Sequence, residues 1–99
     1  MTGRALIVDD TQLNLQILQN KLEREYYTVF TANSGEESVR MALEINPDII
    51  LMNAVMRGMD GFNAIRLIRT LPKMVNVPII ITTALNRPEE KVRGRSWGR

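Results

Sequence analysis

The sequence predicts an α/β fold in which one parallel β-sheet carries helices on both faces, a doubly wound arrangement. Short apolar runs alternate with amphipathic segments along the chain, in the order β-α-β-α-β-α-β-α. Turn-forming residues separate these segments, and no internal repeat or linker interrupts them. Such alternation is typical of a parallel sheet whose crossover connections are helices. We therefore expect residues 1–99 to form a single domain.

The first strand and helix are predicted from an apolar run that is followed by leucines at helical spacing. Residues 5–8 are apolar and end abruptly at Asp9, a pattern typical of a buried parallel strand. Residues 11–25 place leucines three and four positions apart between polar residues, which predicts an amphipathic helix. The leucines expected on its inner face are Leu15, Leu18 and Leu22.

The second strand and helix are predicted from β-branched residues and a helix-start pattern. Residues 28–32, TVFTA, are mostly β-branched or aromatic, which favours a strand. In residues 34–46, Ser34 can cap a helix while Glu37 reaches back to it. The Asn-Pro pair that follows ends this helix. Its inner face is expected to contain Val39, Ala42 and Leu43.

The second half of the chain repeats the alternation. Residues 48–52 and 78–84 are rich in isoleucine and predict the third and fourth strands, the latter starting at a proline where the missing N–H matters least. Residues 61–71 place apolar side chains on one face of a third helix, and residues 87–94 begin like a fourth. The inner face of the third helix is expected to contain Phe62, Ile65 and either Leu67 or Ile68.

The composition limits the chemistry that this protein can use. The chain has no cysteine and no histidine, which excludes disulfides, thiolate metal sites and imidazole catalysis. No segment approaches the roughly 18 apolar residues of a membrane span, and the N-terminus lacks a signal-peptide pattern. We therefore expect a cytoplasmic protein with no membrane partner. The net charge of +2 comes from a basic C-terminal segment with one tryptophan, which is weak support for nucleic-acid binding, and we expect none.

Polar side chains follow three of the predicted strands at their carboxyl ends. Asp9 and Asp10 follow the first strand, Asn53 follows the third, and Thr82 and Thr83 lie near the end of the fourth. The carboxyl ends of parallel strands line one edge of a sheet, where ligands of such folds bind. Two adjacent carboxylates with a third polar group suit a hard divalent cation. The sequence therefore predicts a magnesium site at this edge.

Three stretches of the sequence resemble the receiver domain of two-component response regulators, the family with the chemotaxis-protein-Y fold. They are LIVDD, PDIILMNAVMRGMDGF and VPIIITTA, which stand in the family's order and spacing. The resemblance covers nearly the whole chain and is closest to the receivers of diguanylate-cyclase regulators and of small single-domain cell-cycle regulators. It implies a flavodoxin-like sheet with strand order 2-1-3-4, to which the family adds a fifth strand. It also implies a phosphorelay signalling module rather than an enzyme, with a sensor histidine kinase or a phosphotransfer protein as its partner.

The resemblance implies a role for each matching residue at the sheet edge. Asp10 would hold magnesium directly and Asp9 mostly through water. The backbone carbonyl of Val55 would complete the protein's share of the metal ligands. Thr83 would hydrogen-bond the phosphoryl group, and the small side chain of Ala84 would leave room for it.

Asn53 departs from the family at the position of the aspartate that accepts the phosphoryl group. Phosphoryl transfer needs an anionic carboxylate oxygen as nucleophile, and a neutral amide does not supply one. We therefore expect no catalytic residue and no phosphorylation. Magnesium binding is expected to be weak or absent, because the site has one negative charge fewer. Arg57 occupies the family's usual proline position and is expected to be a solvated loop residue rather than a partner of Asp9 or Asp10.

The C-terminal part of the sequence departs from the family as well. The family's fifth strand carries a lysine that pairs with the phosphoryl group, and we expect that role to be unfilled here. Residues 95–99, RSWGR, are unlike the family and would arise by a frameshift within a Leu-Glu-Ala-Gly-Ala segment, so a truncated receiver is expected. Residues 79–81 would then form an exposed strand edge, which favours a homodimer through edge pairing or strand swapping.

The leading interpretation is an inactivated receiver module that works by binding other proteins. Two alternatives stay open. One is a magnesium-dependent phosphatase-like hydrolase that uses Asp9 and Asp10, although that class also needs a lysine and a cap domain. The other is a non-functional, frame-shifted fragment.

Overall fold

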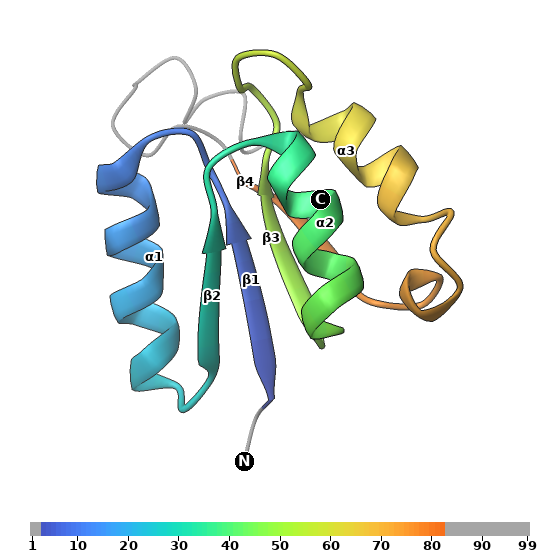
Figure 1. The fold of residues 1–99 in the computed structure, drawn as a ribbon. Helices are drawn as coiled ribbons and strands as arrows, with labels where there is room; N and C mark the ends of the chain where they lie inside the picture. The colour runs from blue at the N-terminus through green and yellow to red at the C-terminus, as the bar shows by residue number, and fades with distance from the viewer. Residues whose placement is uncertain (1–2, 83–99) are drawn as a thin grey trace.

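The computed structural model describes residues 3–82 and contains a four-stranded parallel sheet in the order β2-β1-β3-β4 (Figure 1). This order confirms the predicted doubly wound, flavodoxin-like α/β fold. The elements, in chain order, are β1 (Arg4–Val8), α1 (Gln12–Arg24), β2 (Thr28–Ala32), α2 (Gly35–Ile45), β3 (Ile49–Asn53), α3 (Gly61–Ile68), a 3₁₀ helix (Pro72–Met74) and β4 (Ile79–Thr82). The predictions for Thr83, Ala84, the helix at 87–94 and the tail at 95–99 lie outside the described residues.

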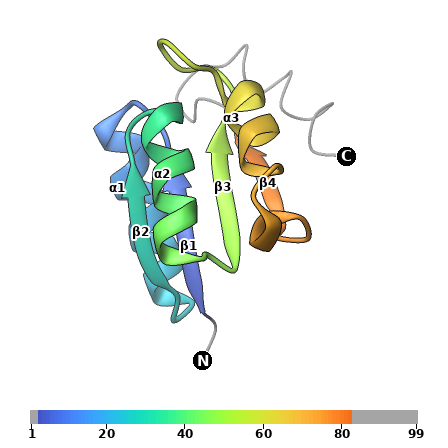
Figure 2. The same cartoon turned by 45° about the vertical axis from the view of Figure 1, so that its right-hand side comes forward.

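Helices cover both faces of the sheet (Figures 1 and 2). On one face, α1 buries Leu15 against Ile7 of β1 and Leu51 of β3, and its other predicted leucines pack on the same cluster. On the other face, α2 and α3 share a larger core with the strands. Successive strand residues point to opposite faces, so each central strand contributes to both cores. This explains why β1 and β3 are apolar throughout rather than alternating.

The ends of α2 follow the predicted signals with one difference. The hydroxyl of Ser34 accepts a hydrogen bond from the amide of Glu37 at 3.1 Å, as predicted. The Glu37 carboxylate, however, accepts from the amide of Asn33 at 2.8 Å, one residue before the cap. The helix ends at Asn46, whose φ of 49° is left-handed, as is common for asparagine at this position.

The inner faces of α2 and α3 contain smaller residues than predicted. Ser38 and Ala42 of α2 and Ala64 and Ile68 of α3 are buried. The predicted core residues Leu43, Phe62 and Leu67 are instead 63%, 48% and 44% exposed. Small side chains let α2 and α3 lie close to the sheet and to each other. The buried face of α2 therefore consists of residues 35, 38 and 42. The predictions for Leu43 and Phe62 were wrong for this reason. Of the two alternatives given for the third helix, Ile68 is the buried one.

The third helix is also shorter than predicted. It ends at Ile68 instead of continuing to residue 71, and the 3₁₀ helix that leads towards β4 follows it. The guanidinium Nη1 of Arg69 donates to the carbonyls of Met74 at 2.8 Å and Val77 at 2.6 Å. These bonds supply hydrogen-bond donors to backbone carbonyls of the segment between α3 and β4. A continued helix would have paired such carbonyls within itself.

The helices in residues 3–82 are short, and the longest, α1, has 13 residues. Within this part of the chain, none has the length and the apolar character that a membrane crossing requires.

Candidate functional site

The carboxyl ends of β1 and β3 bring the predicted polar residues together. Val8 pairs with Met52 in the parallel register, so Asp9 and Asn53 continue from neighbouring positions of the two central strands. Asn53 is itself the last residue of β3 and pairs with Thr82 of β4, whereas the prediction ended the strand at Met52. Three of the predicted site residues, including Asp10, are thus clustered at one edge of the sheet, and Thr83 and Ala84 lie beyond the described residues.

Asp9 is the most buried charged group of the site, with 1% of its surface exposed. One carboxylate oxygen accepts a hydrogen bond from the amide of Thr11 at 2.9 Å. The other accepts from the side-chain amide of Asn14 at 3.1 Å. Both oxygens are therefore held by the first turn of α1, which fixes the carboxylate in place.

Asn14 is a site residue that the sequence analysis missed. Its side chain is 4% exposed, although asparagine is usually found on protein surfaces. Its position in the sequence could have identified it. Asn14 lies immediately before Leu15 and one helical turn before Leu18, on the inner side of α1. A polar residue at such a position needs a buried partner, and Asp9 is that partner.

The pKa of Asp9 is shifted upward from its ordinary value. Burial raises the pKa of this carboxyl most, and the negative charge of Asp10 adds to the rise. Hydrogen bonds from Thr11, Asn14 and Asn53 to the charged form of Asp9 oppose the shift. Burial has the largest effect, so the surroundings of Asp9 favour its neutral, protonated form over the charged carboxylate more than water does.

Asn53 is 4% exposed, and its amide is oriented by the backbone that follows it. Its Nδ2 donates to the carbonyl oxygen of Val55 at 2.9 Å, and its Oδ1 faces the amide of Val55 at 3.4 Å. The opposite orientation of the amide would bring two oxygens together at 2.9 Å, with no proton between them. The hydrogen-bond network therefore assigns the nitrogen of Asn53 to the side of the Val55 carbonyl.

The loop from Ala54 to Asp60 is attached to β1 as well as to its own ends. The Asp10 carboxylate accepts a hydrogen bond from the backbone amide of Arg57 at 3.1 Å. The prediction that Arg57 has no part in binding Asp10 was therefore wrong for its backbone, whereas its exposed side chain agrees with a solvated residue. Asp60 ends the loop by capping α3, since its carboxylate accepts from the amide of Asn63 at 2.9 Å.

A glycine is required where this loop joins α3. A Cβ atom at Gly61 would collide with the carbonyl oxygen of Asn53 and would lie 2.9 Å from the Cα of Ala54. The amide of Gly61 also donates to the carbonyl of Ala54 at 2.9 Å. The close approach of α3 to the end of β3 therefore helps to fix the position of Asn53.

Two of the oxygen ligands expected for magnesium at this edge already accept hydrogen bonds within the protein. Magnesium requires oxygen ligands in near-octahedral geometry. The Val55 carbonyl accepts from Asn53, and Asp10 accepts from the amide of Arg57. Within residues 3–82 there is no group of three carboxylate, imidazole or thiolate side chains that could hold a metal ion.

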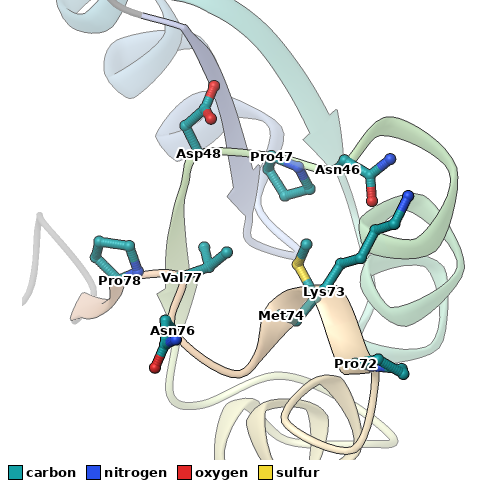
Figure 3. A pocket seen from close by; sticks show the side chains of 9 residues that line it. All are labelled: Asn46, Pro47, Asp48, Pro72, Lys73, Met74, Asn76, Val77 and Pro78. Atoms are coloured by element: carbon teal, nitrogen blue, oxygen red, sulfur yellow. The ribbon is translucent and has the colours of Figure 1, made fainter.

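A hollow lies at the opposite end of the strands from Asp9 and Asn53, near the amino ends of β3 and β4 (Figure 3). It has a volume of about 400 Å³. Its charged groups are Asp48 and Lys73, and the Asp48 carboxylate already accepts from the amide of Arg4 at 2.7 Å. The remaining lining residues are amides, prolines and apolar side chains: Asn46, Pro47, Pro72, Met74, Asn76, Val77 and Pro78. This hollow offers no paired acid and base, so the candidate site is the edge with Asp9 and Asn53.

The fold and the site define a class of protein, the receiver-like α/β signalling domains with an acidic pair at the end of β1. The family model for the response regulator receiver domain matches residues 5–98. The chain belongs to this family, whose members are modules of two-component signal transduction and bind magnesium at the acceptor site in general. This confirms the resemblance and the predicted signalling class.

Individual relatives agree with the family. The chain is 39% identical over 98 residues to the response regulator PleD of Caulobacter vibrioides, covering 99% of this chain but 22% of PleD. It is 35% identical over 96 residues to the protein PilH of Pseudomonas aeruginosa, covering 97% of this chain and 79% of PilH.

Solved structures show the same fold. The chemotaxis protein CheY4 of Vibrio cholerae superposes with a TM-score of 0.81 at 28% identity, covering 99% of this chain and 82% of CheY4. The receiver domain of the histidine kinase CKI1 of Arabidopsis thaliana, solved with Mg²⁺ and BeF₃⁻, superposes with a TM-score of 0.76 at 27% identity. That comparison covers 96% of this chain and 74% of the receiver.

Proposed function

We propose that this chain is a receiver module that does not accept a phosphoryl group and that works by binding other proteins. The observation that carries the proposal is the position of Asn53, at the end of β3 beside Asp9 and before the loop to α3. The resemblance to the family gives this position to the acceptor aspartate.

The chemistry of the amide supports the absence of phosphorylation. In phosphoryl transfer to a carboxylate, an anionic oxygen attacks phosphorus, a P–O bond forms, and the bond from phosphorus to the donor breaks. The Asn53 oxygen is neutral, and its nitrogen lone pair is delocalised into the carbonyl. Both polar atoms of the amide are also directed towards the backbone of Val55. Asn53 therefore lacks the anionic oxygen that the attack on phosphorus requires.

The acidic pair does not replace the missing nucleophile. Both oxygens of Asp9 already accept hydrogen bonds, and the group is buried. Asp10 is held by the amide of Arg57. Hydrogen bonds to a carboxylate stabilise its charge and lower its nucleophilicity, which argues against a phosphatase-like hydrolase and supports a role without catalysis.

A module that neither accepts a phosphoryl group nor catalyses hydrolysis can still act by binding other proteins. We propose a sensor histidine kinase or a phosphotransfer protein as its partner, as in the family, and magnesium affinity well below that of a site with an aspartate. The roles that the resemblance implies for Thr83 and Ala84 remain predictions. A cytoplasmic location without nucleic-acid or membrane binding stays a prediction from the composition.

We also propose a homodimer that pairs through β4. Among the described residues, β4 pairs only with β3, and Ile80 is 49% exposed. An open strand with apolar side chains is a template for pairing with a second chain. Size-exclusion chromatography with light scattering should show twice the chain mass at micromolar concentration, and a monomer there would contradict this part.

The proposal is tested by incubating the protein with acetyl phosphate and Mg²⁺ and measuring its intact mass. The wild type should keep its mass, and the matched variant Asn53→Asp restores the carboxylate as a comparison. A wild-type protein that gains the mass of one phosphoryl group would overturn the proposal. Catalytic release of inorganic phosphate by the wild type would instead point to the hydrolase.

A further inference from the structure

The nitrogen of Asn53 binds a backbone oxygen of the site. Its Nδ2 donates to the carbonyl oxygen of Val55 at 2.9 Å, and the Asn53 side chain is one of the groups that lower the pKa of Asp9. Within residues 3–82, every buried side-chain polar atom has a hydrogen-bond partner. The site is thus complete in its described part without an added ion.

A primary amide nitrogen carries two N–H donors and the positive end of the amide dipole. Here that end faces the Val55 carbonyl, and the amide also favours the charged form of Asp9; carbonyl and carboxylate oxygens are the kinds of ligand that a divalent cation otherwise binds. An aspartate at position 53 would have no donor for Val55. It would also place a third negative charge beside Asp9 and Asp10, which repel each other already. A divalent cation would offset that added repulsion, and the site with Asn53 has less repulsion to offset.

We infer that the Asn53 amide takes the structural place of the divalent cation, so that the loop of residues 54–60 keeps its arrangement without metal. The inference uses the proposed function only in assigning Asn53 to the acceptor position. The loop is held at three points: Asn53 at Val55, Asp10 at Arg57, and Asp60 at the start of α3.

The inference has a consequence for partner binding. Val55 is 64% exposed, and the side chain of Arg57 is exposed beside it. The amide holds the backbone of this surface directly through Val55. A partner that contacts this loop would therefore meet the same surface with or without divalent cations.

The test compares thermal unfolding of three proteins in EDTA and in excess Mg²⁺. The wild type should unfold at the same temperature in both. Asn53→Asp should unfold at a lower temperature than the wild type in EDTA and recover most of the difference in Mg²⁺. Asn76→Asp makes the same change of charge at the opposite edge of the sheet, near the hollow in Figure 3, and should show no dependence on Mg²⁺. An equal rise of the unfolding temperature with Mg²⁺ in the wild type and in Asn53→Asp would overturn the inference.

A second measurement on the wild type alone covers the case in which Asn53→Asp fails to fold. Titration of the ¹⁵N-labelled wild type with Mg²⁺ should leave the amide resonances of Val55 and Arg57 unshifted. Its Mg²⁺ affinity should be on the order of 100-fold below that of a site with three carboxylates. Saturating shifts at submillimolar Mg²⁺ would overturn the inference. They would leave the proposed function intact, because that function fails only if the wild type gains a phosphoryl group.

Discussion

The side-chain amide of Asn14 donates to the buried carboxylate of Asp9 over 3.1 Å, which joins the first turn of α1 to the end of β1. Removing this donor leaves a buried carboxylate oxygen without its partner. We expect Asn14→Ala to lower the free energy of unfolding by about 1–3 kcal/mol and to raise the pKa of Asp9 further, since one of the groups that oppose its shift is lost. Urea unfolding and carboxyl NMR titration measure the two effects.

The control for this variant is Asn20→Ala on the exposed side of the same helix. Asn20 accepts a hydrogen bond only from exposed Gln16, so its loss should change the free energy of unfolding by less than about 0.5 kcal/mol. Equal effects of the two alanine variants would contradict a structural link between Asn14 and Asp9.

The raised pKa of Asp9 predicts a contribution to stability that decreases as pH rises. Between the ordinary value of 3.8 and the raised folded value, the folded protein binds the proton more tightly than the unfolded chain. The contribution of Asp9 to the free energy of unfolding therefore falls through this window and is lowest above it. The difference between the wild type and Asp9→Asn isolates this group, because the other carboxylates cancel. This difference, wild type minus variant, should decrease with increasing pH, and a constant or rising difference in urea unfolding would refute the assignment.

The contact of Gly61 with the end of β3 predicts a strong effect of a single methyl group. Gly61→Ala places a Cβ against the backbone of Asn53 and Ala54, which cannot move without disturbing β3. We expect a loss of about 2–3 kcal/mol in the free energy of unfolding. Gly58→Ala is the comparison, because a Cβ at Gly58 would make only an ordinary contact with Glu36 Oε2 at 3.7 Å, so that only its φ of 74° is unfavourable for alanine. It should cost about 1 kcal/mol, and a larger loss for Gly58→Ala than for Gly61→Ala would contradict the packing argument.

The guanidinium of Arg69 predicts a local effect on the segment before β4. Its bonds to the carbonyls of Met74 and Val77 hold the end of the 3₁₀ helix. Arg69→Met should speed hydrogen exchange at the amides of Met74 and Val77 and lower the free energy of unfolding by about 1 kcal/mol. Arg66→Met removes an exposed arginine whose described bond, to Asn63, is 3.4 Å long, and it should leave this segment unchanged. Unchanged exchange in Arg69→Met would show that the arginine does not hold the segment.

The sequence patterns were sufficient to predict a parallel sheet and the edge at which Asp9, Asp10 and Asn53 lie, whereas the strand order was implied by the resemblance to the receiver family. Continuous apolar runs that end in polar residues identify parallel strands, and parallel strands bring Asp9, Asp10 and Asn53 to one edge whatever the details of packing. Ser34 and Asp60 were predictable as helix starts because capping depends on local sequence alone.

Other features depend on the three-dimensional arrangement of the elements. Leu43 and Phe62 are apolar at helical spacing, yet smaller neighbours occupy the inner faces because α2 and α3 lie close to the sheet. Asn14 gains its role from the way in which the start of α1 folds back onto Asp9. The direction of the Asn53 amide likewise follows from the backbone of Val55 and is not determined by the residue type.

The central claim is that position 53 offers no nucleophilic carboxylate, and beryllofluoride tests it most directly. This phosphoryl mimic bonds to a carboxylate oxygen, and bound fluoride is observed by ¹⁹F NMR in the presence of Mg²⁺. The wild type should show only free fluoride species, while Asn53→Asp should be tested in parallel for a bound signal. A bound, saturable fluoride signal in the wild type would contradict the account, because it would show that a carboxylate oxygen of the wild type accepts the phosphoryl mimic.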